Sequence, residues 1–209
     1  LGPDGSRLSK RHGAMNILEY KDQGLLPEAM LNYLVRLGWS FGDQEVFNIQ
    51  EMIDAFDVKN INKSSAKFDL EKLEWLNQQH LSNSDNSELT EFLKLNTSLE
   101  ELPSAKTIDS FVNAYKPRVN NLNELVGYFN TLYAENFTVE ESAAEKFLKQ
   151  EILVPFQDLL EMLEQGEWNT ESINQSVKST CEKHGIGFGK IGQPLRVAIT
   201  GGTESPSID

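Results

Sequence analysis

The sequence predicts an all-α protein, and two observations carry that prediction. Apolar residues recur at three- and four-residue spacing through most of the 209 positions, which is the period of a helix with one buried side. Strict alternation of apolar and polar residues, which is typical of a half-buried strand, never persists beyond about five positions. Proline, glycine and capping residues bound the helical segments, so each segment has a local start or stop signal.

The first helices follow a glycine-rich stretch. In LLPEAMLNYLVRLGWS (25–40), Pro27 marks a helix start and Gly38 a stop. In NIQEMIDAFDV (48–58), Asn48 and Glu51 have the spacing of a capping box. Asp69 is the predicted N-cap of a helix in FDLEKLEWLNQQHL, residues 68–81. The polar run SNSDNSE (82–88) then predicts a linker between two compact units.

Short helices continue beyond this linker. SELTEFLKL (87–95) predicts one amphipathic helix, and residues 106–135 predict two more. The break between these two is expected at Lys116–Pro117, because the residue before a proline resists the α conformation.

The last third predicts four further helices, two of them within residues 138–163. Thr138 and Glu141 have capping-box spacing ahead of the apolar pattern in 138–163. A long helix begins near Asn169 and ends at Gly185, and a final helix contains Pro194. The predicted organisation is therefore an all-α chain in three parts, 1–84, 85–140 and 141–209.

The composition limits the classes of partner. The chain has 19 basic and 32 acidic residues, a net charge of −13. Binding of polyanions over the whole surface is therefore disfavoured, and any nucleic-acid contact must come from a few placed cations. No apolar run approaches the ~18 residues of a membrane helix, and there is no export signal, so we expect no membrane partner and a cytoplasmic location. The single cysteine, Cys181, is three residues from His184, and an isolated pair of this kind predicts no metal site.

One short segment departs from the acidic character of the chain. GPDGSRLSKRHGA (2–14) places Arg7, Lys10, Arg11 and His12 within six positions, among glycines that allow the backbone to approach a ligand closely. Cations on such a loop suit a polyphosphate whose charge rises during a reaction. The alternative is an ordinary solvated surface turn.

The order of residues in this loop resembles a known signature. Arg7-Leu8-Ser9-Lys10-Arg11 is similar to the KMSKS motif of class I aminoacyl-tRNA synthetases, and Lys-Arg-His-Gly after the serine resembles the bacterial glutamyl-tRNA synthetases. The segments LPEAMLNYLVRLGWS, FDLEKLEWLN, KPRV and GQPLRVAITG follow in that family's order. Arginine stands at position 7 where the family commonly has lysine; the charge is kept, although the two side chains bind phosphate differently.

The resemblance implies a division of roles. Lys10 would bind ATP phosphates and stabilise the activation transition state, with Ser9 and Arg11 completing the loop and Arg7 and Leu8 beside them. Residues 1–84 would hold this loop and the stem-contact fold, and 85–140 and 141–209 would form the two anticodon-binding helical parts, the second truncated at its C-terminus. ATP and Mg²⁺ would serve the full enzyme, with none expected bound to this chain.

Arg118, in KPRV, corresponds by resemblance to the arginine that reads the third anticodon base. Glutamate anticodons end in C, and the near-cognate glutamine anticodons end in G. Cytosine presents the acceptors N3 and O2, which suit a guanidinium that has only donors, whereas guanine presents N1–H and N2–H. Arginine here predicts an enzyme that accepts glutamate tRNA and refuses glutamine tRNA. The alternative is a surface arginine after a proline-broken helix.

Further contacts are implied near the C-terminus. Arg196, in QPLR, corresponds to a second arginine that contacts the anticodon. Ser205, Pro206 and Ile208 align with a turn that meets anticodon bases, although serine and isoleucine depart from the family pattern. Lys190, at a helix start, is a candidate for a tRNA phosphate contact. Trp39 and Trp75 lie on apolar faces and are predicted to be core residues.

The sequence therefore predicts the C-terminal part of a bacterial glutamyl-tRNA synthetase, with glutamate tRNA as its partner and no DNA. ATP and glutamate would bind through the absent catalytic domain. The chain lacks the dinucleotide-type fold and the HIGH signature, so we expect no aminoacylation by this chain alone. Two alternatives stay open: a tRNA-binding paralogue module without a catalytic domain, and a helical protein-interaction scaffold whose basic loop is incidental.

Overall fold

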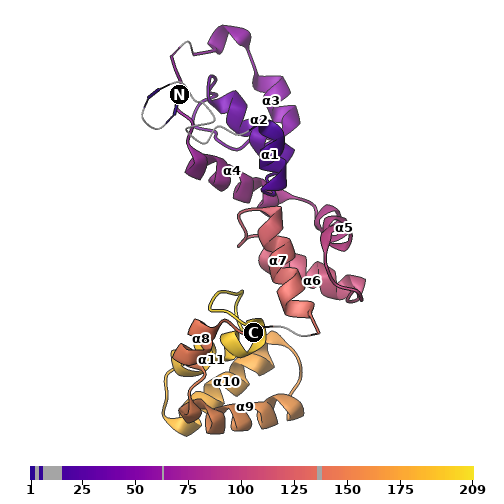
Figure 1. Cartoon of the computed structure of the whole chain (residues 1–209), viewed down its shortest axis with the longest axis vertical. Coiled ribbons are helices and arrows are strands. Elements are labelled where there is room, and N and C mark those ends of the chain that lie inside the picture. Colours follow the sequence, from indigo (N-terminus) through magenta and orange to yellow (C-terminus); the bar gives the residue numbers. More distant parts are fainter. Residues whose placement is uncertain (3–4, 7–15, 63, 136–137) are drawn as a thin grey trace. The chain divides into compact units, whose positions relative to one another are not determined.

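The computed structural model of the chain describes residues 1–2, 5–6, 16–62, 64–135 and 138–209, and they form an all-α fold (Figure 1). The prediction of the fold class is therefore confirmed. Within these residues, extended pairing is limited to one isolated antiparallel bridge between Phe41 and Gln44. Across the same ranges, no helix combines the length and the apolar character needed to cross a membrane.

The chain forms two compact units, Leu1–Phe129 and Asn130–Asp209. The predicted boundary between residues 84 and 85 lies inside the first unit. The predicted division into three parts stays a prediction, and the two units are described separately below.

The first unit begins with a group of helices around an aromatic and aliphatic core. Its elements are α1 (Ile17–Asp22), α2 (Pro27–Arg36), α3 (Ile49–Ala55), a 3₁₀ turn (Val58–Asn60) and α4 (Leu70–Asn83). Helices α2 and α4 pack against each other, and Tyr33, Leu73 and Leu76 are buried between them. Phe68 meets the Tyr33 ring edge-on, with the ring centroids 5.4 Å apart.

Two tryptophans of this region differ in their environment. Trp39 is only 3% exposed and packs with Phe47 and Met52, as predicted. Trp75 is 39% exposed, and the Lys72 ammonium lies 3.9 Å from its ring centroid. The prediction that Trp75 is a core residue is wrong, because it lies on the side of α4 away from Leu73 and Leu76.

Three more helices follow in the first unit, and the last of them extends past its boundary at Phe129. They are α5 (Asn86–Asn96), α6 (Ala105–Tyr115) and α7 (Leu122–Tyr133). Helices α5 and α6 pack together, and Phe111 meets the Phe129 ring edge-on with the centroids 5.0 Å apart. The predicted linker 82–88 is much shorter in the structure, since α4 runs to Asn83 and α5 begins at Asn86.

The second unit packs its helices around one small core. Its elements are α8 (Glu141–Phe147), a 3₁₀ turn (Gln150–Ile152), α9 (Leu153–Gln165), α10 (Thr170–His184) and α11 (Gly189–Thr200). The core consists of Ile152, Leu159, Val177, Cys181 and Ile191. Burial raises the pKa of the Cys181 thiol.

Local start and stop signals explain most helix ends. Asn48 and Glu51 form the predicted capping box, and the Asp69 side chain accepts from the Lys72 backbone N–H. Gly185 ends α10 with φ +62°, in the left-handed region that glycine adopts readily. The capping box predicted at Thr138 and Glu141 is wrong: α8 begins after Glu140, which makes no side-chain cap.

Candidate nucleic-acid interface

A tight turn after α6 presents Arg118 to solvent. Helix α6 ends at Tyr115, and the Arg118 backbone N–H donates to the Tyr115 carbonyl at 2.8 Å. Lys116 keeps α-helical angles and still donates to the Val112 carbonyl, so the expected reason for the break is wrong. The break comes from Pro117 itself, which has no N–H with which to continue the ladder.

Hydrogen bonds with α4 and with Ser84, the residue after it, hold this turn in place. Gln78 donates to the Pro117 carbonyl at 2.9 Å, and Asn77, which is fully buried, donates to the Asn120 carbonyl at 2.5 Å. The Lys116 ammonium donates to the Ser84 carbonyl at 3.1 Å. Polar groups anchored on both sides of Arg118 give it a fixed backbone, which is what selective recognition of a base needs.

The Arg118 side chain remains available for a ligand. It is exposed, and one terminal nitrogen donates to the Ala114 carbonyl at 3.2 Å. No carboxylate in the described part of the chain forms an ion pair with it. Since a guanidinium has five N–H donors, most of its donor capacity is unused.

In the second unit, α11 and the C-terminal segment bring together four predicted residues. Arg196 is half-buried, and its Nε donates to the Ser205 hydroxyl oxygen at 2.7 Å. That hydroxyl donates in turn to the Pro206 carbonyl at 2.8 Å. The hydroxyl therefore orients the guanidinium, and the Arg196 terminal nitrogens keep their donors for another group.

Two glycines allow this segment to fold back onto α11. Gly201 has φ +76° and ends the helix in a left-handed turn. A Cβ on Gly192 would lie 3.2 Å from the Ile208 side chain and 3.0 Å from the Phe188 ring. The absence of a side chain at Gly192 therefore lets Ile208 lie close against the helix, and Ser205 and Pro206 are held beside Arg196.

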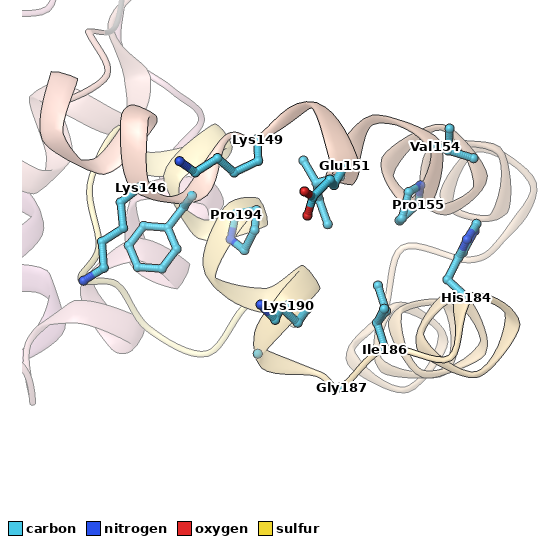
Figure 2. A pocket seen from close by; sticks show the side chains of 13 residues that line it. Lys146, Lys149, Glu151, Val154, Pro155, His184, Ile186, Gly187, Lys190 and Pro194 are labelled. Carbon is cyan, nitrogen blue, oxygen red and sulfur yellow. The ribbon is translucent and has the colours of Figure 1, made fainter.

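A groove of about 710 Å³ lies elsewhere in the second unit, among α8, the starts of α9 and α11, and the end of α10. Figure 2 shows Lys146 and Lys149 toward one end of it, Glu151 and Lys190 nearer the middle, and His184 at the other end. Lys146 and Lys149 had no motif to mark them in the sequence. Only the chain path brings α8 to the start of α11, where Lys190 lies.

An ion-pair cluster borders the far end of the groove. Asp158 accepts from the Lys183 ammonium at 2.8 Å and from the His184 Nε2 at 2.5 Å. These two contacts hold the pKa of the Asp158 carboxyl below its ordinary value, and the contact with Lys183 has the larger effect. His184 thus has a carboxylate partner on α9, and Cys181 is buried in the core, so the two side chains serve packing and pairing.

Two known protein families match parts of this chain. Residues 86–209 match the model described as "Anticodon binding domain", and residues 1–75 match "tRNA synthetases class I (E and Q), catalytic domain". The chain belongs to the anticodon-binding domain family. Arg118, Arg196 and the segment 205–208 all lie within the matched anticodon-binding region.

Relatives of this anticodon-binding chain are glutamate–tRNA ligases. It is 42% identical over 217 aligned residues to the glutamate–tRNA ligase of Francisella tularensis subsp. novicida, covering 100% of this chain and 46% of the relative. It is 44% identical over 214 residues to glutamate–tRNA ligase 1 of Alkalilimnicola ehrlichii, with 100% and 45% coverage. The chain spans slightly less than half the length of the curated relatives it matches.

Solved structures agree with these relatives. A glutamate–tRNA ligase from Elizabethkingia meningosepticum, solved in complex with its amino acid, matches with a TM-score of 0.83 and 27% identity, over 100% of this chain and 45% of that one. The glutamate–tRNA synthetase of Elizabethkingia anophelis matches with a TM-score of 0.77 and 26% identity, over the same shares of the two chains.

The structure does not describe the basic loop on which the sequence resemblance was based. Arg7, Leu8, Ser9, Lys10 and Arg11 lie outside the described residues. Their assignment to ATP stays a prediction.

Proposed function

We propose that this chain recognises glutamate tRNA as the tRNA-binding part of a glutamate–tRNA ligase. Its similarity to such ligases runs over 100% of its length. One structural observation carries the proposal: an exposed arginine, Arg118, stands on a turn fixed by hydrogen bonds from the Asn77 and Gln78 side chains of α4. A surface arginine with no role needs no such support.

Arg118 would read the third anticodon base. Its donors complement the N3 and O2 acceptors of cytosine and meet the N1–H and N2–H donors of guanine unfavourably. Arg196 would supply a second set of donors, oriented by Ser205. Pro206 and Ile208 would shape the surface against which the anticodon loop lies.

The remaining assignments concern the complete ligase. Arg7, Leu8, Ser9, Lys10 and Arg11 would bind the ATP phosphates, with Lys10 stabilising the charge that develops during glutamate activation. Within the described residues, no group of three His, Cys, Asp or Glu side chains is arranged to hold a metal ion. In the complete ligase, the part that this chain does not span would bind glutamate and Mg²⁺ and complete the ATP site, and the ligase would be a cytoplasmic enzyme without a DNA or membrane partner.

A titration tests the proposal. The chain is titrated with a glutamate tRNA transcript at several salt concentrations, with a DNA hairpin of the same length as control. We expect binding that weakens as salt rises, by a log–log slope of about −0.7 to −0.9 for each phosphate contacted. Preference for the tRNA over the hairpin is also expected. Absence of tRNA binding at low salt would contradict the proposal and favour a helical scaffold.

A further inference from the structure

The second unit concentrates its positive charge in one place. Residues 130–209 contain six basic and thirteen acidic side chains. Three of the six basic residues, Lys146, Lys149 and Lys190, line the groove, whereas only one of the thirteen acidic residues, Glu151, does so. The groove is therefore a locally positive surface on a negatively charged unit.

These lysines are available to a ligand. All three are exposed, and none forms an ion pair with a carboxylate of the described residues. The Lys146 ammonium lies 5.1 Å from the centroid of the Phe147 ring. The other lysines of this unit differ in their setting: Lys183 is paired with Asp158, and neither it nor Lys178 lines the groove.

The groove is separate from the Arg196 site. Lys190 and Arg196 are six residues apart on α11, which at 3.6 residues per turn places them about 120° apart around the helix. Pro194, four residues after Lys190, lies on the groove side. Arg196 contacts the C-terminal segment, whereas the groove is lined from α8, α9 and α10.

The floor of the groove is apolar. Ile152, Pro155 and Pro194 are buried residues that line it, and Phe147 and Ile186 are half-buried. A surface with several exposed lysines and an apolar floor suits a strand whose phosphates meet the lysines while its sugars and bases cover the floor. Lysine supplies compact charge without the fork of arginine, so such a site binds phosphate and reads no sequence.

The geometry points to a second RNA contact in this groove: Lys146, Lys149 and Lys190 bind the phosphodiester backbone of the tRNA, on the flank of α11 away from Arg196. This inference rests on the proposed function and adds a positioning surface to it. Contacts to phosphates fix the register of an RNA on a protein, while base contacts at Arg118 and Arg196 supply specificity.

The test compares two double variants by titration with a glutamate tRNA transcript at several salt concentrations. In Lys149→Ala/Lys190→Ala the groove loses two cations. In Lys106→Ala/Lys178→Ala the chain loses the same charge at exposed positions outside it. We expect the groove variant to bind at least about tenfold more weakly. Its log–log salt slope should be shallower by about 1.4 to 1.8. The control variant should stay within about threefold of the wild type.

Glu151→Gln supplies a variant of opposite sign. Removing the one carboxylate of the groove should strengthen tRNA binding, whereas Glu161→Gln, at an exposed position of α9, should leave it nearly unchanged. Thermal unfolding of every variant serves as the control that each one is folded.

Three outcomes would overturn the groove inference, and only the last of them would also overturn the proposed function. If the wild type binds tRNA and the groove variant matches the control, the groove inference is overturned and the proposed function stands. Binding of a polyglutamate peptide that the groove substitutions abolish, with tRNA affinity unchanged, overturns it in favour of an acidic protein partner. A wild type that binds no tRNA overturns both.

Discussion

At the residue scale, the proposed function depends on hydrogen-bond donors that protein groups leave unused. Arg118 and Arg196 each make one side-chain hydrogen bond among the described residues and keep their other donors. By contrast, the ammonium of Lys116, only two residues from Arg118, donates to the Ser84 carbonyl at 3.1 Å and to the Asn86 side-chain oxygen at 2.8 Å. Neighbouring cations in the same sequence motif thus have opposite roles, one structural and one exposed to a ligand.

Substitution of Arg118 tests base reading. Arg118→Gln should lower the preference for a glutamate anticodon stem-loop over a glutamine one, because an amide presents both a donor and an acceptor and tolerates guanine. The expected loss of discrimination is about 1–3 kcal/mol, up to roughly a hundredfold. Competition binding with the two stem-loops measures it. Lys106→Ala, exposed on α6, is the control, and unchanged discrimination would remove Arg118 from the site.

Burial of His80 predicts a pH dependence of stability. Its Nε2 lies 3.1 Å from the Asn32 Oδ1, which also accepts from the Phe47 N–H at 2.8 Å. Burial lowers the pKa of His80, and nearby Glu28 opposes this weakly. Unfolded His80 therefore takes up a proton below about pH 6.5, whereas the folded form resists it. The contribution of His80 to the free energy of unfolding is therefore greatest above about pH 6.5, and it decreases as the pH falls toward the pKa of His80 in the folded state.

Urea denaturation at pH 7.5 and 5.5 checks this expectation. The loss of stability between the two values should be smaller in His80→Gln than in the wild type. The two chains differ only at position 80, so the difference isolates His80. An equal loss in both would contradict the assignment.

At the element scale, a few buried polar contacts join helices that are far apart in sequence. Asn77 on α4 accepts from the Leu26 N–H at 2.8 Å and donates to the Asn120 carbonyl, so one side chain connects the start of α2 with the approach to α7. The Leu122 N–H donates to the Gly24 carbonyl at 2.9 Å, beside it. The turn of Arg118 takes its position from this junction.

A pair of glycine substitutions tests the junction. Gly24 has φ +80°, and a Cβ there would lie 2.7 Å from the Asn123 backbone nitrogen. Gly24→Ala should therefore destabilise the chain by about 2–4 kcal/mol, through backbone strain and overpacking. Gly127→Ala, within α7 and with open space at its Cβ, should instead stabilise by about 0.5–1 kcal/mol. Chemical denaturation of both variants measures the difference, and equal effects would contradict the close approach at Gly24.

At the scale of the whole molecule, the net charge of −13 shapes binding more than folding. Such an excess of negative charge would repel RNA, so exposed cations would decide where an RNA docks. The cations proposed to contact the tRNA are divided between the two compact units. Arg118 lies in the first unit, and Arg196 and the groove lysines lie in the second. Recognition of one RNA by both units would join modest individual contacts into a specific one.

The sequence predicted some features well because their causes are local. Helix periodicity, the capping box at Asn48 and the glycine stop at Gly185 all act within one turn of helix, so neighbouring residues decide them. Thr138 failed as a cap because α8 begins two residues later than predicted, where the Glu140 N–H donates to the Gly201 carbonyl at 2.8 Å. That contact comes from the far end of α11, which no local pattern contains.

By itself, the sequence determined the fold class, the order of the helices and the arginines proposed to read the anticodon, because periodicity, caps and motifs are properties of short segments. Only the tertiary structure decided what those segments meet. It exposed Trp75, oriented Arg196 through Ser205, and brought Lys146 and Lys149 to Lys190, about forty residues away. Burial and charge clustering depend on which distant helices pack together, and long-range packing sets that arrangement.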